Sequence, residues 1–80
     1  MHELTLNIGE QRRLQKGIAS RVYEIERNPT LRPKLFRELQ REIKTYFGVD
    51  TYKNIKSKDL QQALLYIEKW LPEKPDNFAV

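Results

Sequence analysis

Residues 57–72 read SKDLQQALLYIEKWLP, and this stretch carries the clearest helical pattern in the chain. At about 100° per residue its apolar side chains form one stripe: Leu60, Ala63, Leu64, Ile67, Trp70 and Leu71. Ser57 stands where a helix cap is expected, Asp59 falls in the first turn, and Pro72 ends the pattern. The stretch predicts a helix over about residues 58–71, with Trp70 in the core and its indole N–H either bonded to an acceptor or at an edge that water reaches.

A second amphipathic helix is predicted upstream, over about residues 31–47. Thr30 is its expected cap, and Pro33 is tolerated in the first turn because amides there lack helical partners. Gly48 follows the helix at the position where a left-handed C-cap is usual. The apolar face of this helix consists of Leu35, Phe36, Leu39, Ile43, Tyr46 and Phe47.

A first helix is predicted over about residues 8–27. Asn7 and Glu10 have the spacing of a capping box, in which each side chain bonds the backbone amide of the other residue. The helix should stop before Asn28-Pro29, because a residue that precedes proline avoids helical geometry. Its apolar stripe consists of Leu14, Ile18, Val22 and Ile25.

The segments outside these helices are short. Residues 3–8 alternate in polarity, which favours a short strand, but its partner would have to be the connector 50–55, the tail or another chain. Tyr52 and Ile55 are the expected core anchors of the connector. The tail 73–80 carries little pattern, and we expect it to be loose.

Length and composition limit the fold to one small domain. The chain has 80 residues, no cysteine and a net charge of +4. We therefore expect a single domain over residues 1–80, all-α, with three helices packed into a compact core and no disulfide or thiolate metal site. It has no apolar run of the roughly 18–20 residues that span a membrane and no signal peptide, so we expect a cytoplasmic protein. The positive charge suits nucleic acid or an acidic protein.

Enzyme chemistry finds little support in the sequence. His2 is the only histidine, and the three glycines form no phosphate-binding loop. Carboxylates such as Glu38 and Glu42 lie beside arginines, as is typical of surface helices. No base, nucleophile and orienting group can be assembled, so we expect no catalytic site, no metal site and no cofactor.

The best candidate binding surface is a row of basic side chains on the second helix. These residues lie within about 80° of arc, opposite the apolar face: Lys34, Arg37, Arg41 and Lys44. Such a row can contact phosphates or an acidic partner. Glu38 and Glu42 flank it and are expected to pair with Arg41 and its neighbours, so a merely solvated helix face is the competing interpretation.

A second basic cluster lies in the connector and consists of Lys53, Lys56 and Lys58. With Ser57 at a helix N-terminus it could hold a phosphate, although ordinary loop solubility is the simpler explanation. About nine residues separate the second and third helices, whereas a DNA-binding helix-turn-helix has a turn of about three or four. We therefore expect no standard recognition helix.

Three apolar residues point away from their helices' stripes: Tyr23, Leu65 and Tyr66. If exposed, they are candidates for a protein interface, including one between copies of this chain.

Several pieces of the sequence carry a family pattern through their order and spacing: Arg21-Val22-Tyr23-Glu24, then Phe47-Gly48-Val49, then Tyr52, Lys53 and Ile55, then an amphipathic helix that ends at Trp70. In this order they resemble the carboxy-terminal domain of phage antirepressor proteins. In that family the domain follows an amino-terminal domain related to baculovirus repeated-ORF proteins, so we expect this chain to be excised from a longer two-domain protein.

The resemblance implies a part in the lysis–lysogeny decision inside a bacterial host, through interference with a phage repressor. It supplies no catalytic residues. Two functional hypotheses follow for the domain itself. The first is a binding module that contacts DNA or a partner protein such as the repressor. The second is a structural oligomerisation domain with no ligand of its own.

Overall fold

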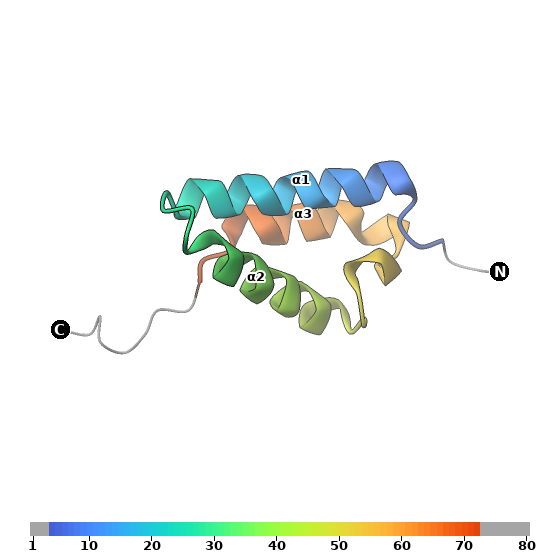
Figure 1. Ribbon diagram of the computed structural model, residues 1–80. Helices are drawn as coiled ribbons and strands as arrows, with labels where there is room; N and C mark the ends of the chain where they lie inside the picture. The colour runs from blue at the N-terminus through green and yellow to red at the C-terminus, as the bar shows by residue number, and fades with distance from the viewer. Residues whose placement is uncertain (1–3, 73–80) are drawn as a thin grey trace.

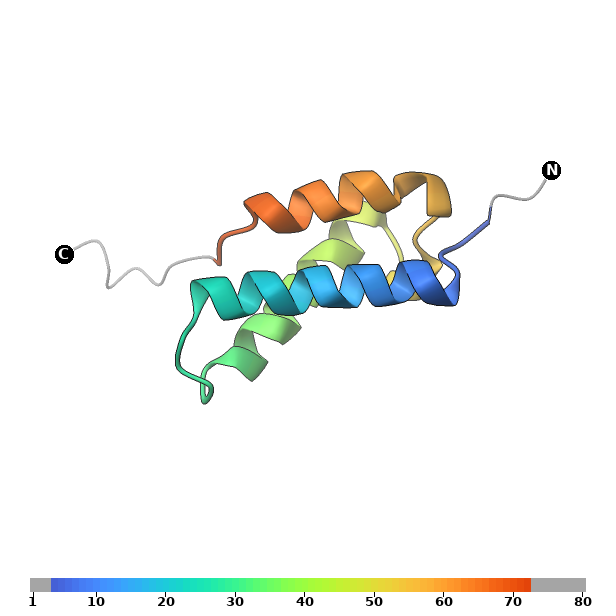
Figure 2. The ribbon, with the colours of Figure 1, turned by 90° about the horizontal axis from the view of Figure 1, so that it is seen from above.

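The computed structural model describes residues 4–72, and within them the chain forms three α-helices: α1 (Ile8–Ile25), α2 (Arg32–Phe47) and α3 (Leu60–Lys69). Two short 3-10 helices, η1 (Tyr52–Asn54) and η2 (Ser57–Asp59), lie between α2 and α3. Helices α1 and α3 lie side by side, and α2 crosses beneath them (Figures 1 and 2). The predicted all-α, three-helix fold is confirmed, whereas the tail 73–80 lies outside the described residues.

The predicted capping box opens α1. The Asn7 side chain accepts the Glu10 amide at 2.8 Å, and the Glu10 carboxylate accepts the Asn7 amide at 2.9 Å. The helix ends at Ile25, two residues before the predicted end, because Glu26 is already extended, at φ −122° and ψ 115°. The carbonyl oxygen of Glu26 accepts a hydrogen bond from Arg32 Nε at 2.9 Å, so the turn into α2 begins there.

The start of α2 differs from the prediction at its cap. Thr30 is not the cap: Leu31 occupies that position without a side-chain bond, and the Thr30 amide donates to Asn28 Oδ1 at 3.0 Å. Thr30 thus belongs to the turn that Asn28 organises. Pro33 lies in the first turn and Gly48 adopts a left-handed C-cap (φ 67°, ψ 38°), as predicted.

The start and end of α3 also depart from the sequence pattern. Ser57 does not cap α3 through its side chain; it opens η2, and its hydroxyl bonds to the Thr5 carbonyl oxygen and to the Glu10 carboxylate in the first turn of α1. At the other end Trp70 is extended, at φ −67° and ψ 136°, so Leu71 leaves the helical stripe and is 68% exposed. The prediction that Leu71 is buried was therefore wrong, because the helix stops before it.

The alternating lead-in does not extend into a strand within residues 4–72. It makes one antiparallel bridge, between Thr5 and Lys56, in which Leu6 donates its amide to Ile55 at 3.0 Å. The partner is the end of the connector, one of the alternatives that the sequence left open. The capping box at Asn7 turns the chain into α1 at once, so too few residues remain to lengthen the pairing.

The core lies where the three helices meet and is closed by the lead-in and the connector. Ile55 is buried and Tyr52 packs against the core, as predicted for the connector anchors. A methyl group at Gly17 would lie 3.3 Å from Leu64 Cδ2, so α1 and α3 approach closely there. The buried side chains are Leu6, Leu14, Ile18, Val22, Leu39, Ile43, Ile55, Leu60, Ala63, Ile67 and Trp70.

Candidate nucleic-acid interface

The basic row predicted on the second helix lies on α2, away from the buried Leu39 and Ile43. Three of its members are exposed and the fourth, Lys44, is half-buried. None of the four side chains makes a hydrogen bond or an ion pair within residues 4–72. Ion pairs within this part of the chain therefore do not neutralise the positive charge of the row. We call the row the α2 ridge, and it consists of Lys34, Arg37, Arg41 and Lys44.

The glutamates that were expected to pair with the α2 ridge do not do so. Glu42 Oε1 accepts the indole Nε1 of Trp70 at 3.1 Å and the hydroxyl of Tyr66 at 3.5 Å. Glu38 Oε1 is buried and has no hydrogen-bond partner in the described residues. The predicted pairing with Arg41 was wrong: Glu42 bonds to Tyr66 and Trp70 instead. Glu38 lines a small hollow with Lys34, Arg37 and Arg41 but lies within ion-pair distance of none of them.

The carboxylates on α1 are also engaged elsewhere. Glu10 accepts the Ser57 hydroxyl at 2.6 Å, and this bond, together with the Asn7 amide, lowers the pKa of Glu10. Glu24 pairs with Arg21 at 2.7 Å. Glu10 and Glu42 are thus occupied by hydrogen bonds to other groups, and most cations on α1 and α2 have no carboxylate within ion-pair distance among residues 4–72.

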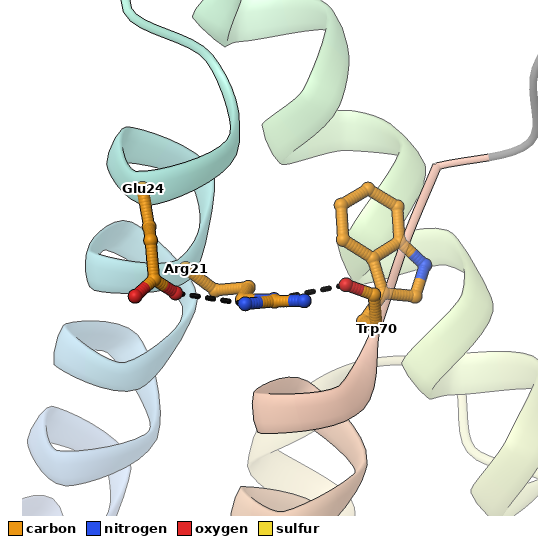
Figure 3. A network of polar contacts seen from close by, with 3 residues as sticks. All are labelled: Arg21, Glu24 and Trp70. Carbon is orange, nitrogen blue, oxygen red and sulfur yellow. Dashed lines mark hydrogen bonds and ion pairs between the residues drawn. The ribbon is translucent and has the colours of Figure 1, made fainter.

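Arg21 fixes the end of α3 from α1. Its Nε donates to the carbonyl oxygen of Trp70 at 2.9 Å, and its guanidinium lies between that oxygen and the carboxylate of Glu24 (Figure 3). A cation at a helix C-terminus also suits the helix dipole. Trp70 is therefore held by α1 through its backbone and by Glu42 of α2 through its indole.

A second row of cations lies on α1, and the sequence pattern alone did not single it out. Tyr23 packs edge-on against Phe36 of α2, with ring centroids 6.1 Å apart. Lys16 precedes Tyr23 by two helical turns and Arg12 precedes Lys16 by one, so both share the face of α1 that carries Tyr23. Both side chains are exposed. The sequence feature that could have pointed to Arg12 and Lys16 is their helical spacing from Tyr23. This spacing becomes informative only once Tyr23 is known to contact α2.

The connector lysines separate in space. Tyr52 of η1 accepts a hydrogen bond from Gln15 Nε2, which places the exposed Lys53 at the end of α1 that carries Arg12 and Lys16. Lys56 instead bridges to Thr5 and, like Lys58, belongs to the segment that enters α3. The amide of Ser57 donates to Leu4 at 2.8 Å and is not available to a phosphate.

The sequence as a whole matches the model of one domain family, the ORF6C domain, over residues 1–78. The chain belongs to the ORF6C domain family. This domain is found in phage antirepressor-type proteins, which confirms the resemblance seen in the sequence. No curated protein and no solved structure matches this ORF6C domain significantly.

Neither a metal-binding group nor a membrane-spanning helix occurs in the described part of the ORF6C domain. Residues 4–72 contain no group of three or more histidine, cysteine or acidic side chains placed to hold a metal ion. Within the same residues, no helix is both long and apolar enough to cross a bilayer.

The off-stripe apolar residues of the ORF6C domain do not form one surface. Tyr66 packs against Tyr46, with ring centroids 4.7 Å apart, whereas Tyr23 packs against Phe36. These two contacts are about 15 Å apart along α2 at about 1.5 Å per residue. Leu65, which is 46% exposed, borders Tyr66 in a hollow of about 430 Å³ between α2 and α3. Tyr23 is therefore separate from the Leu65 and Tyr66 surface.

Proposed function

We propose that this ORF6C domain is a DNA-contacting module of a phage antirepressor-type protein, and that it binds the phosphate backbone in the cytoplasm of the host. The observation that carries the proposal is the set of unpaired cations on neighbouring elements. We define the basic face by five of them: Arg12, Lys16, Arg37, Lys44 and Lys53.

The members of the basic face come from both helices and from η1. Arg37 follows Phe36, the residue that contacts Tyr23 of α1, and Lys44 lies two turns further along the same side of α2. Arg12 and Lys16 lie on the Tyr23 side of α1, about 16 and 10 Å from Tyr23 toward the start of the helix. Two rows of cations on either side of a helix–helix contact can follow a line of phosphates, and each neutralised phosphate releases counterions.

Backbone contact fits the connection between α2 and α3 better than base readout by a helix-turn-helix. The connection runs from Gly48 to Asp59 and contains both 3-10 helices, so it is far longer than the turn of about three or four residues in that motif. We accordingly propose binding that depends strongly on salt and weakly on DNA sequence.

A binding role, rather than catalysis or pure scaffolding, is part of this proposal. A structural oligomerisation domain with no ligand is the alternative, and it predicts no salt-sensitive affinity for DNA. Titrating a short fluorescent duplex with the domain, from about 50 to about 200 mM salt, separates the two by fluorescence anisotropy.

The basic face provides the variant for this titration, because four of its members are exposed and their side chains make no hydrogen bond or ion pair within the described residues. Changing Arg12, Lys16, Arg37 and Lys53 together to Gln should remove most of the affinity while circular dichroism stays unchanged. Absence of binding by the unaltered domain near 50 mM salt would reject the proposal.

A further inference from the structure

The hollow between α2 and α3 has an apolar surface that is open to solvent. Tyr46 is 53% exposed and Leu65 is 46% exposed, while Trp70, at 5%, lies deeper among the lining residues. Leu71 is exposed at the end of the hollow because the chain leaves the helix there. We define the apolar groove as Tyr46, Leu65, Tyr66, Trp70 and Leu71. Exposed apolar surface gathered in this way is typical of a binding site.

The polar atoms of the groove are already bonded within the molecule. The indole of Trp70 and the hydroxyl of Tyr66 both donate to Glu42, and Gln62 Nε2 donates to the Tyr46 hydroxyl at 3.3 Å. A ligand therefore meets mainly apolar surface there. Burial and the adjacent Glu42 carboxylate raise the pKa of Tyr66, so its ring is uncharged at neutral pH.

The rim of the groove is positive. Lys69 lines the groove directly. Arg41 lines an adjoining hollow of about 290 Å³, which shares Tyr46 and Tyr66 with the groove. Among the described residues that line these two hollows, Glu42 alone carries a carboxylate, and Tyr66 and Trp70 already bond to it. Positive charge at the rim of an apolar surface favours a ligand with the opposite charge around an apolar stripe.

We propose that the apolar groove binds an amphipathic segment of a partner protein, whose apolar side chains are flanked by aspartate or glutamate. Apolar anchors at helical spacing would enter the groove, as in helix-in-groove recognition. Acidic residues beside them would face Lys69 and Arg41. A second copy of the chain fits less well, because a twofold contact through this surface would bring the two positive rims together.

This inference concerns a different surface from the basic face, so the two proposals fail independently. None of the five residues that define the basic face lines the groove. Trp70 is the only tryptophan in the sequence and lies at the groove, so its fluorescence reports occupancy directly. DNA binding is measured separately, by the anisotropy of a labelled duplex.

The experiment uses two synthetic helical peptides of about 15 residues with the same leucine stripe. One carries Glu at the flanking positions and the other carries Lys. Saturable change in Trp70 emission is expected with the Glu peptide, whose affinity should exceed that of the Lys peptide at least about tenfold. Lys69→Glu should reduce this preference, whereas Lys16→Glu, the matched charge reversal outside the groove, should change it less than about twofold.

Leu65→Glu places a negative charge in the groove and should weaken binding of the Glu peptide at least about tenfold. Its helical content is checked by circular dichroism, and Leu71→Glu replaces it if it fails to fold, because that side chain is more exposed. The inference is overturned if a folded Leu65→Glu or Leu71→Glu variant still binds the Glu peptide with unchanged affinity. It is also overturned if the emission of Trp70 does not respond to the Glu peptide. A dimer in light scattering that Leu65→Glu dissociates overturns it as well, because the occupant would then be a second copy.

Discussion

The indole Nε1 of Trp70 lies 3.1 Å from Oε1 of Glu42, and this hydrogen bond joins the end of α3 to the middle of α2. Trp70 is buried, so its N–H needs an acceptor that water does not readily supply. The same bond directs the Glu42 carboxylate away from Arg41, its neighbour on the α2 ridge. The need of the buried Trp70 indole for an acceptor thus helps to leave the α2 ridge without Glu42 as an ion-pair partner.

Glu42 should therefore contribute to stability through Trp70 rather than through an ion pair. Glu42→Ala leaves the indole N–H without its acceptor and should lower the free energy of unfolding by about 1–3 kcal/mol. Glu42→Gln keeps an oxygen that can accept the bond and should cost clearly less. Urea unfolding followed by Trp70 fluorescence measures both. Equal losses in the two variants would mean that the hydrogen bond contributes nothing.

Glu10 should make stability depend on acidic pH. Its pKa lies below the usual 4.5 because it accepts bonds from the Ser57 hydroxyl and the Asn7 amide, with Arg13 nearby. A lowered pKa in the folded state means that this stabilisation is present above about pH 4.5 and disappears as the pH falls through the lowered value.

Replacing the Glu10 carboxylate by an amide tests how much its protonation contributes to acid unfolding. Glu10→Gln should flatten the acid side of the stability profile, measured by thermal unfolding at several pH values. Glu68→Gln is the control, since Glu68 is exposed on α3 and accepts no hydrogen bond from the described residues. An unchanged acid profile in Glu10→Gln would contradict the role given to the Ser57 contact.

Replacing Gly48 should lower the free energy of unfolding because of the backbone conformation alone. Its φ of 67° lies in the left-handed region, and a methyl group there would meet no atom within 4 Å. Gly48→Ala should therefore lose about 1–2 kcal/mol through conformation rather than collision. Gly48→Asn should lose less, because asparagine tolerates this geometry. Chemical denaturation ranks the two variants, and a greater loss for asparagine would argue against this explanation.

Local features of the fold could be predicted from the sequence because local geometry determines them. The Asn7–Glu10 capping box, the left-handed Gly48 and the buried stripe of α3 each depend on spacing within a few residues. The position of Trp70 and its need for an acceptor were predicted in the same way. The family could be recognised because the order of such local pieces is itself distinctive.

Features that depend on the packing of one element against another could not be predicted. Ser57 had the right residue type for a cap, but its hydroxyl is used by Glu10 and Thr5, which are distant in sequence. Glu42 had a cation beside it on the same helix, yet it bonds to Trp70. Arg12 and Lys16 had no evident significance until Tyr23, which shares their face of α1, proved to contact Phe36 of α2.

The central claim is that cations from α1 and α2 form one DNA-binding face, and a matched pair of double variants tests it most directly. Lys16→Gln with Arg37→Gln removes one charge from each helix of the basic face. Arg13→Gln with Lys69→Gln removes the same charge elsewhere, since Arg13 lies on the Glu10 side of α1 and Lys69 lies at the apolar groove.

The measurement is the dependence of duplex-DNA affinity on salt, from about 50 to about 200 mM, for both variants and the unaltered domain. The slope of log affinity against log salt should become shallower by about 2 in the basic-face variant, about 0.9 for each lost phosphate contact. It should stay essentially unchanged in the control variant. Equal slopes in the two variants would contradict the account, because net charge alone would then explain any binding.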